Sequence, residues 1–400
     1  MSLDLIGLNI AGMMKCTGDS IGTRLCRTKE SFPSNDSFFC LTLRERKSIL
    51  TRVSYRVSEH IMAYYTQTDI AEKLKVSRVT VSKALRDHPD ISRDMKRRVK
   101  EIAEEFGYTP NLIAKNLTSK KTLTIGIVVP DLENSFFSYA VDSMVDAASE
   151  HHYHTILTVS RENEQNEKYN IQSLIGMRVD GLLVCVSQRT SDPHVFEELK
   201  KKKMPVVFFD RQMEGTDFRS VTFNDEIGAV DALDHIIGNG YSRIGHFAGY
   251  SNVSIGRKRC EGYRSAMKKN GLEIDPAWIL AAGFEIQDGY DSFMKLYQTK
   301  NIPEVILTVN DRVALGVYKA AKEVGMEIPK DIGIVGFGFS ETAQMFSPTL
   351  SIIHQDPRRL GTAALEVLIE EMQNTKQDRP RNVLIEEKFI WNNSIIKKQH

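Results

Sequence analysis

Short apolar runs alternate with amphipathic stretches along residues 122–400. Each run predicts a strand buried on both faces, and each amphipathic stretch predicts the helix that follows. The runs form two series of four, at residues 122–130, 155–160, 181–187 and 205–210 and then at 221–224, 243–249, 305–310 and 332–337. This alternation is typical of parallel sheets with right-handed crossovers, and the segment is too long for one sheet of such short strands. We therefore predict two doubly wound α/β subdomains.

Residues before this segment have the pattern of short capped helices. Thr66 and Asp69 form a capping box for a helix that ends at residue 74. Ser77 caps a second helix that ends at about residue 85, so only residues 75–76 separate the two. Two helices joined by so tight a turn predict a compact helical unit.

A third helix is predicted between Ser92, its cap, and Gly107, which ends it. Its apolar positions share one buried face: Met95, Val99, Ile102, Ala103 and Phe106. Three short helices around one small core predict an all-α domain at residues 62–110. Residues 112–117 predict one more short helix, which has little apolar surface of its own to bury.

Residues 1–61 show neither sustained helical periodicity nor strand alternation, whereas the pattern becomes regular directly after Met62. We expect these residues to form a poorly ordered extension. We interpret them as an upstream stretch joined to the chain by a misplaced start codon, with Met62 as the natural first residue.

The net charge of +1 hides an uneven distribution of charge. Residues 66–121 carry +5 and residues 1–65 carry +3, so residues 122–400 carry −7. A basic block joined to an acidic body indicates that one end of the chain meets a polyanion and the other does not. The alternative is that the difference arises by chance.

Hydropathy and cysteine content narrow the function classes. The chain has no run of about 18 uncharged apolar residues and no secretion signal at its start, so we expect a cytoplasmic protein without a membrane span. Five cysteines without a CxxC pair predict neither a disulfide framework nor a zinc site, and we expect no cofactor. The cluster His151, His152 and His154 lies where a predicted helix gives way to a strand, which favours a solvated or helix-end role over a metal site.

The second short helix carries the candidate nucleic-acid chemistry. Its capped start and the tight turn before it match the helix-turn-helix, whose second helix lies in the DNA major groove. Arg78 and Val79 stand in the first turn, where side chains reach base edges, and an arginine there can hold a guanine with two hydrogen bonds. Thr80, Ser82 and Lys83 are placed for phosphates or further bases. The helix caps Thr66 and Ser77 are further candidate DNA-binding residues. The alternative is a solvated face on an ordinary helical bundle.

The residues from Thr66 to Phe137 closely resemble the start of the lactose-repressor/galactose-repressor (LacI/GalR) family of bacterial transcription regulators. The resemblance continues in order through "FFDR" (208–211), "VNDRVALGVY" (309–318), "IVGF" (334–337) and "SPTLSIIHQD" (347–356), and covers roughly residues 64–395. It implies a nucleoid-associated repressor, a homodimer on double-stranded operator DNA, controlled by a small-molecule effector such as a sugar or sugar derivative.

The resemblance also implies a domain plan. Residues 111–121 would form a hinge helix and linker, with Asn111, Ala114 and Leu117 at the positions that enter the minor groove. Leu117 would wedge between base pairs, a known device of minor-groove binding; the alternative is an ordinary linker residue. Residues 122–400 would form the effector-binding core, as in periplasmic binding proteins. Its N-subdomain would comprise residues 122–211 and 353–379, and its C-subdomain residues 212–352 and 380–400.

By the same resemblance, one set of residues would line an effector pocket between the subdomains: Phe136, Phe137, Asp210, Arg257, Phe284, Asn310, Asp311 and Phe339. Aromatic faces, carboxylates and an arginine suit a hydroxylated or anionic ligand. The alternative for any of them is a purely structural role, such as a helix cap at Asn310.

Two departures from the family pattern bear on specificity. Gly338 and Phe339 stand where many relatives have acidic or amide side chains, which argues against a simple sugar and for a bulkier or less polar effector. Lys83 replaces the family's usual arginine and lacks its planar fork. The operator sequence is therefore expected to differ from that of family members with arginine at this position.

Two rival functions follow from the same segments. A solute-binding protein would share the two-lobed core but would have no use for residues 66–117. An enzyme would need a catalytic motif, and the sequence contains no P-loop or nucleophile elbow.

Overall fold

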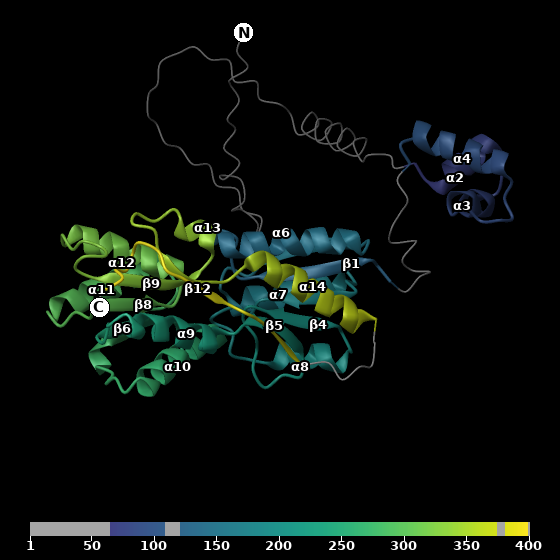
Figure 1. Cartoon of the computed structure of the whole chain (residues 1–400). Helices are drawn as coiled ribbons and strands as arrows, with labels where there is room; N and C mark the ends of the chain where they lie inside the picture. Colours follow the sequence, from purple (N-terminus) through teal and green to yellow (C-terminus); the bar gives the residue numbers. More distant parts are fainter. Residues whose placement is uncertain (1–64, 109–120, 374–380, 399–400) are drawn as a thin grey trace, which may run out of the picture. The chain divides into compact units, whose positions relative to one another are not determined.

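The computed structural model describes residues 65–108, 121–373 and 381–398 (Figure 1). The chain divides into two compact units, one ending at Thr109 and one beginning at Pro110. The predicted extension at residues 1–61 and the predicted short helix at residues 112–117 lie outside the described residues. Within the described ranges, every helix is too short or too polar to cross a membrane.

The first unit, which we call the head, contains α2 (Gln67–Leu74), α3 (Arg78–Leu85) and α4 (Arg93–Glu105). The capping box is confirmed, since the Thr66 backbone N–H donates to the Asp69 carboxylate at 2.6 Å. The Ser77 hydroxyl caps α3 by accepting from the Thr80 N–H at 3.0 Å. The predicted two-residue turn is also confirmed, with Lys75 in the left-handed conformation at φ 53°.

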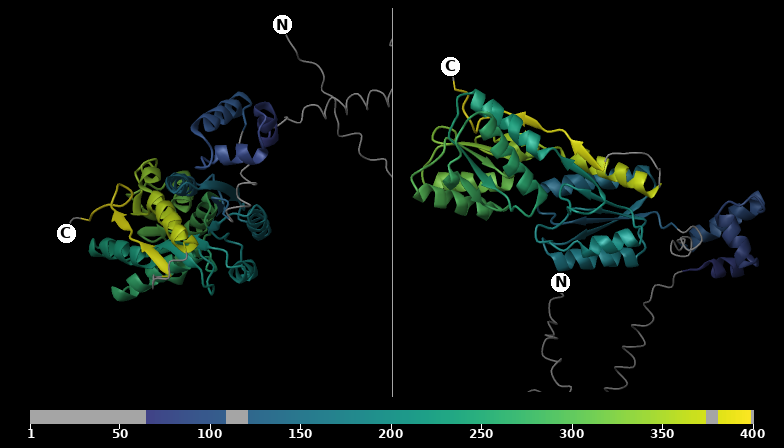
Figure 2. Two further views of the ribbon diagram at one scale, coloured as in Figure 1. Left: turned by 90° about the vertical axis from the view of Figure 1, so that its right-hand side faces the viewer. Right: turned by 90° about the horizontal axis from the view of Figure 1, so that it is seen from below.

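The second unit holds two α/β lobes, each a sheet between two layers of helices (Figures 1 and 2). The first sheet has the order β11-β5-β4-β3-β1-β2 and all its strands are parallel: β1 (Thr124–Val129), β2 (His154–Val159), β3 (Gly181–Val184), β4 (Val206–Phe209), β5 (Arg219–Phe223) and β11 (Asn382–Ile385). Helices α6 (Ser135–Glu150) and α14 (Pro357–Met372) cover one face, and α7 (Glu164–Gly176) and α8 (His194–Lys201) cover the other. Consecutive strand residues therefore enter opposite cores; Phe209 packs under α14, while Phe208 packs under α8.

The second lobe repeats this architecture. Its sheet has the order β12-β10-β9-β8-β6-β7 and contains β6 (Ile244–Ala248), β7 (Ile279–Ala281), β8 (Val305–Thr308), β9 (Gly333–Gly338), β10 (Ser351–His354) and β12 (Lys388–Ile390). Only β12 runs antiparallel in this sheet. Helices α9 (Asp225–Gly238) and α10 (Ser254–Lys269) cover one face, α11 (Ile286–Gln298) and α12 (Asp311–Glu323) cover the other, and short α13 (Ser340–Ala343) follows β9. The predicted fold class is thus confirmed.

The predicted division between the lobes is wrong at two strands. The prediction places β5 in the C-subdomain segment 212–352 and β11 in the segment 380–400, but both pair within the first sheet, where β5 lies between β4 and β11. Periodicity identifies a short apolar strand but not the sheet that it joins, because sheet membership depends on its pairing partners. The chain therefore crosses between the lobes after β5, after β10 and after β11.

Paired helices approach each other at glycines. A Cβ atom on Gly316 of α12 would lie 2.0 Å from the Ile286 carbonyl oxygen of α11, and one on Gly289 of α11 would lie 2.1 Å from the Val313 carbonyl oxygen of α12. In the first lobe, a Cβ on Gly361 of α14 would lie 2.1 Å from the Ala140 carbonyl oxygen of α6. Because each obstacle is backbone, a side chain at these positions would force the helices apart.

We expect Gly316→Ala to lower the free energy of unfolding by about 1–3 kcal/mol, as overpacking a close helix contact does. Chemical denaturation of the full chain, followed by circular dichroism, measures the effect. Gly176→Ala is the control, because it lies at the end of α7 with no atom within 4 Å of the new Cβ. The control should be neutral or stabilising by up to about 1 kcal/mol. Equal unfolding midpoints for both variants would contradict the close contact.

Candidate functional site

Helix α3 presents a polar face to solvent and an apolar face to the core of the head. Val81 and Ala84 are fully buried together with Ile70 and Val99. Arg78 is exposed, and Val79 keeps 64% of its surface exposed although it is apolar. Within the described residues, Arg78 makes no hydrogen bond or ion pair, so its guanidinium is available for a ligand.

The other candidate DNA-binding residues of this helix already have local partners. The Thr80 hydroxyl lies 2.9 Å from that of Ser77, and the Lys83 ammonium pairs with Asp90 at 3.0 Å. Arg86, which the sequence analysis missed, donates to the Ser82 hydroxyl at 2.8 Å. The sequence could have indicated this contact, because Arg86 follows Ser82 by four residues and so lies on the same side of the helix.

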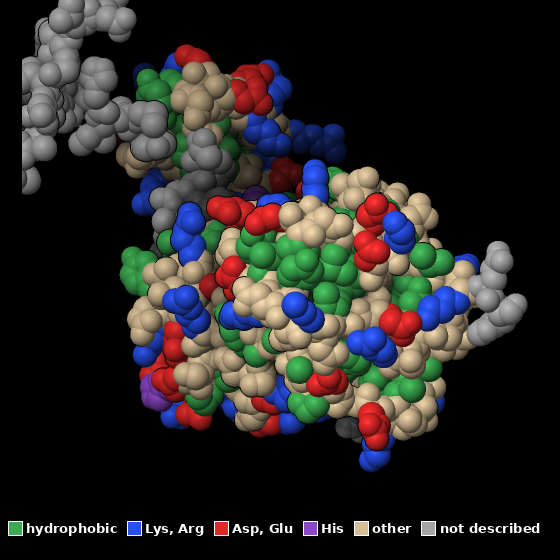
Figure 3. Space-filling view, turned by 90° about the vertical axis from the view of Figure 1, so that its left-hand side faces the viewer, with side chains coloured by type: hydrophobic (Ala, Val, Ile, Leu, Met, Phe, Trp, Pro, Cys, Tyr) green, Lys and Arg blue, Asp and Glu red, His purple; other side chains and the backbone are tan. Residues whose placement is uncertain are grey.

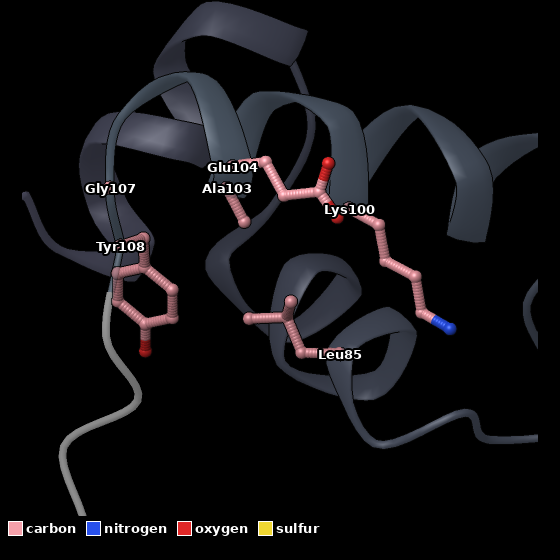
Figure 4. Close-up of a pocket in the computed structure, with 6 residues that line it drawn as sticks. All are labelled: Leu85, Lys100, Ala103, Glu104, Gly107 and Tyr108. Atoms are coloured by element: carbon pink, nitrogen blue, oxygen red, sulfur yellow. The ribbon is translucent and has the colours of Figure 1, made fainter.

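The remaining residues assigned to DNA binding are not all on this face. The Thr66 hydroxyl is occupied by the cap of α2, where it donates to Asp69 at 2.8 Å. Asn111, Ala114 and Leu117 lie outside the described residues. Leu85 at the end of α3 is only half-buried, and its side chain points with that of Tyr108 into a hollow beside Ala103 of α4 (Figure 4).

In the two-lobed unit, the candidate effector residues stand where strands of both lobes end. Asp210 follows β4, Asn310 and Asp311 follow β8, and Phe339 follows β9. Phe136 and Phe137 form the first turn of α6, after the loop that leaves β1. The carboxyl ends of parallel strands are where open α/β sheets bind ligands.

Arg211 joins the two lobes at the centre of this set. Its guanidinium lies over the Phe137 ring of the first lobe, 5.7 Å from the centroid, and over the Phe284 ring of the second, at 5.2 Å. Its Nη1 donates to Glu162 at 2.8 Å, whereas its buried Nε has no hydrogen-bond partner among the described residues. Sequence reasoning included Asp210 but missed this neighbour.

Two carboxylates of the cleft, Asp210 and Asp311, have raised pKa values. Burial raises the pKa of Asp210 to about 6, although the charges of Arg211 and Arg259 oppose the shift. Burial also raises the pKa of Asp311, whose carboxylate lies where a side chain on Gly338 would be, since a Cβ there would approach its Oδ2 to 2.9 Å. The missing side chain at Gly338 thus leaves room for the carboxylate of its neighbour.

Phe339 is withdrawn from the open cleft. Only 6% of it is exposed, and its ring contacts Tyr139 of α6 at 5.2 Å and stacks on His354 at 5.8 Å. The Arg358 guanidinium lies 4.2 Å from the Tyr139 centroid and 5.6 Å from that of Phe339. Phe339 therefore fills space between the lobes rather than presenting a free ring.

A cavity of about 230 Å³ lies between the lobes beside Arg211. Six of its eleven lining residues are polar and uncharged, and they follow β3, β4 and β6: Ser187, Thr190, Ser191, Gln212, Asn252 and Ser254. The lobes touch here, since the Asn252 amide donates to the Gln188 carbonyl oxygen at 2.9 Å. Hydroxyl and amide groups from both lobes thus surround the space.

A buried polar cluster lies where the three connecting segments cross. Arg259 of α10 donates to Asp225 at 2.7 Å and to Gln355 at 3.0 Å. The Gln355 amide in turn donates to Asp225 at 3.0 Å and to Glu387. Since Asp225, Gln355 and Glu387 each stand on a different crossover, the cluster ties all three connections together; we call it the crossover cluster.

Comparison with known proteins identifies the architecture. Residues 122–393 match the family described as periplasmic binding proteins and sugar binding domain of the LacI family, and residues 66–111 match the bacterial regulatory proteins of the lacI family. Catabolite control protein A of Priestia megaterium is 30% identical over 311 residues, which cover 78% of this chain and 93% of that protein. The chain belongs to the LacI family.

Other relatives agree with this assignment. The HTH-type transcriptional repressor PurR of Actinobacillus pleuropneumoniae is 29% identical over 335 residues, which cover 82% of this chain and 98% of the repressor. The crystal structure of the Lac repressor dimer bound to operator and the anti-inducer ONPF superposes with a TM-score of 0.74 at 24% identity, over 83% of this chain and 99% of that one. LacI-family members are transcription regulators rather than enzymes, so the two-lobed unit is a regulatory binding domain.

Within this LacI-family fold, Arg257 and Arg259 occupy opposite sides of α10. Arg257 is partly exposed and pairs with Glu214 and Glu261. Arg259 is 2% exposed and donates to the Val309 carbonyl oxygen next to Asn310. The structure therefore brings Arg259, and not the predicted Arg257, to the other candidate residues. The spacing Ile255, Arg259, Tyr263 and Met267 on one buried stripe was the signal that could have found it.

The histidines of the first lobe have ordinary surroundings. His151 is the C-cap of α6 and lies 3.0 Å from the Glu366 carboxylate. His154 is exposed at the start of β2. Among the residues with described positions, no three His, Cys, Asp or Glu side chains are grouped to hold a metal.

The crossover cluster makes the stability of this LacI-family chain depend on pH. Burial, reinforced by the charge of Asp225, raises the pKa of Glu387 from an ordinary 4.5 to about 8; Asp231 adds to the shift and Arg259 opposes it. Between these pH values the folded state holds a proton that the unfolded chain has released. The contribution of Glu387 to the free energy of unfolding therefore falls as pH rises from about 4.5 to about 8.

We expect Glu387→Gln to remove this contribution, because glutamine keeps the acceptor for Gln355 without the titrating proton. The variant should be more stable than the wild type at pH 8 by on the order of 1–3 kcal/mol, and the two should converge towards pH 4.5. Thermal unfolding across this range measures the difference. Glu386→Gln, at the exposed neighbouring position, should leave the profile unchanged. Parallel profiles for wild type and Glu387→Gln would exclude a buried proton at this site.

Proposed function

We propose that this chain is a repressor that binds operator DNA as a homodimer in the bacterial cytoplasm and releases or tightens its grip when a small molecule enters the cleft. The observation that carries the proposal is the face of α3, where Arg78 and Val79 are exposed in the first turn of a helix held by a two-residue turn. The relatives named as transcriptional repressors, and the solved Lac repressor dimer bound to operator, support it.

On DNA, we assign base recognition to Arg78 and Val79. The guanidinium suits the O6 and N7 acceptors of guanine, and the valine suits a thymine methyl group. Thr80, Ser82 and Lys83 would contact phosphates or neighbouring bases after exchanging their local partners for DNA. At Thr66 and Ser77, the backbone N–H groups of the helix start would donate to phosphates. Asn111, Ala114 and Leu117 would enter the minor groove.

For the effector, we propose a hydroxylated small molecule with one apolar face. The polar lining of the cavity beside Arg211 would exchange hydrogen bonds with hydroxyl groups, and Val186, Met213 and Val253 of the same lining would contact the apolar face. A solved relative, the regulator CelR, is described as a cellobiose complex; it has a TM-score of 0.63 and covers 82% of this chain at 23% identity. The ring of Phe339 between the lobes narrows the space, so the ligand is expected to differ from a simple sugar.

Coupling between the sites would act through the closure angle of the lobes. An effector that contacts both lobes favours one angle and thereby shifts the affinity of the heads for DNA, and the shift is reciprocal. A coupling free energy of roughly 1–3 kcal/mol corresponds to about a 5- to 150-fold change in affinity.

Arg78→Ala tests the DNA-binding assignment. An operator selected in vitro from random duplexes by the wild-type chain provides the probe. We expect the variant to lose about 1–3 kcal/mol of binding free energy and to tolerate substitution of one guanine per half-site, because the substitution removes a base contact. Gel shifts with single-base operator variants measure both effects.

Arg97→Ala is the control for this test, because Arg97 is paired with Asp94 and Glu101 on α4. It should leave base preference unchanged. If the wild-type chain binds every duplex equally, or if Arg78→Ala keeps the wild-type base preference, the proposed recognition is refuted.

A thermal-shift screen of metabolites tests the effector site. A bound ligand at about 100 times its Kd stabilises the protein by about 2.7 kcal/mol, which raises the unfolding temperature. We expect Phe284→Leu to reduce the shift caused by a hit, because the Phe284 ring supports the Arg211 guanidinium beside the cavity. Phe293→Leu, a similar change in the core behind the cleft, should lower the unfolding temperature but keep the shift. A shift retained by Phe284→Leu and abolished by Phe293→Leu would place the ligand elsewhere.

A further inference from the structure

All six strands of the first sheet begin at the end of the sheet that lies away from the cleft. We call this end the outer edge. All six strands are parallel, so they start at one edge and end at the opposite edge, beside the cleft. The segments that lead into the strands therefore lie together along the outer edge. They comprise residues 121–123, 151–153, 177–180, 202–205, 216–218 and 381.

This outer edge is basic. Its connecting segments hold five Lys and Arg against two Asp, a net charge of +3, and Lys200 and Lys201 in the last turn of α8 add two more cations. The contrast is sharp because residues 122–400 as a whole carry −7. Cations gathered in one place on an acidic body create a local positive potential that sums over the group.

Most of these cations are not neutralised by neighbours. Asp217 pairs with both Lys200 and Arg381, and Asp180 accepts from the backbone N–H groups of residues 122–123. Lys201, Lys202, Lys203 and Arg178 are exposed, and no ion pair joins any of them to another described residue. Four unpaired cations therefore face solvent along the edge; we call them the basic edge.

The second lobe supplies an internal comparison, because its fold repeats that of the first. The segments leading into its strands β6 to β9, residues 239–243, 270–278, 299–304 and 324–332, hold three Lys and Arg against five Asp and Glu. Its end face shows basic and acidic side chains interspersed (Figure 3). The positive charge is thus a property of one edge and not of the architecture.

Chain connectivity limits how far the basic edge can lie from the head. Lys121, which begins the described part of the second unit, leads directly into β1 at this edge. The strand order places β4, and with it the end of α8, two strands from β1, or about 10 Å along the edge. Whatever conformation residues 109–120 adopt, the chain from Tyr108 to Lys121 spans at most about 45 Å.

We propose that the basic edge is a second DNA-contacting surface, which binds phosphates of the duplex on which the head sits. The proposal rests on the proposed function of the head, but assigns a role in affinity to residues of the effector-binding unit. Duplex DNA presents one negative charge about every 1.7 Å of its axis, so four exposed lysine and arginine side chains have a dense array of acceptors. Such contacts add affinity and salt dependence without sequence preference.

The test is the salt dependence of binding for a variant in which Lys201→Gln, Lys202→Gln and Lys203→Asn are combined. Asparagine is chosen at position 203 because Lys203 has φ 55°, a conformation that asparagine tolerates. The matched control removes three cations from α10 of the second lobe: Arg264→Gln, Lys268→Gln and Lys269→Gln. The full-length chains are titrated with a duplex selected in vitro by the wild type, extended by one helical turn on each side, and with a scrambled duplex.

We expect the edge variant to have a shallower plot of log K against log salt concentration, by about 0.9 for each phosphate that a protomer no longer neutralises. Its affinity should fall by about the same factor for the selected and the scrambled duplex, so the ratio of the two stays at the wild-type value. The control should keep the wild-type slope, because α10 belongs to the other lobe and carries none of the residues of the basic edge.

If the edge variant has the same slope as the control, the inference is overturned. The same result is expected if the basic edge binds an acidic protein instead of DNA. Loss of the selected-to-scrambled ratio, with the slope unchanged, would likewise overturn it, because phosphate contacts do not select sequence. If the wild type selects no duplex at all, the proposed function falls with the inference; selection without a slope difference removes the inference alone.

Discussion

The direction of the strands is the constraint on which the rest of this structure depends. In each sheet every parallel strand ends at the cleft, so side chains that follow those ends, such as Asp210, Phe284 and Asn310, converge without being close in sequence. The same direction sends every strand beginning to the outside. In the first lobe that outside edge receives the chain from the head and carries the exposed lysines after α8. One topological rule thus separates the ligand-facing end of the lobe from the end attached to the head.

Much of this arrangement could be predicted from local pattern. The caps at Thr66, Ser77 and Ser92 define the helices of the head, because a cap is a contact between residues two or three apart. Most of the apolar strands could be predicted for the same reason, since an apolar run is a local pattern. The pairing of β5 and β11 could not, because those strands are 162 residues apart at Ser220 and Asn382, and only the folded sheet joins them.

The crossover cluster shows the same limit at the level of side chains. Asp225, Arg259, Gln355 and Glu387 come from four distant segments, and no spacing in the sequence joins them. A buried group of this kind is a poor source of stability, since desolvation of the charges offsets their attraction. Its hydrogen bonds are directional, however, and they hold three chain crossings in one mutual geometry. These directional hydrogen bonds would favour one defined separation of the two walls of the cleft.

The glycine contacts between α11 and α12 and between α6 and α14 determine how such a protein can move. A Cβ atom at these glycines would lie only 2.0 to 2.1 Å from a carbonyl oxygen of the neighbouring helix. Helices packed this closely have little room to slide past each other. Relative motion of the lobes is then expected at the three crossings, where the chain passes from one sheet to the other. A ligand that shifts one wall of the cleft would then displace the lobe as a unit, including the strand beginnings at its far end.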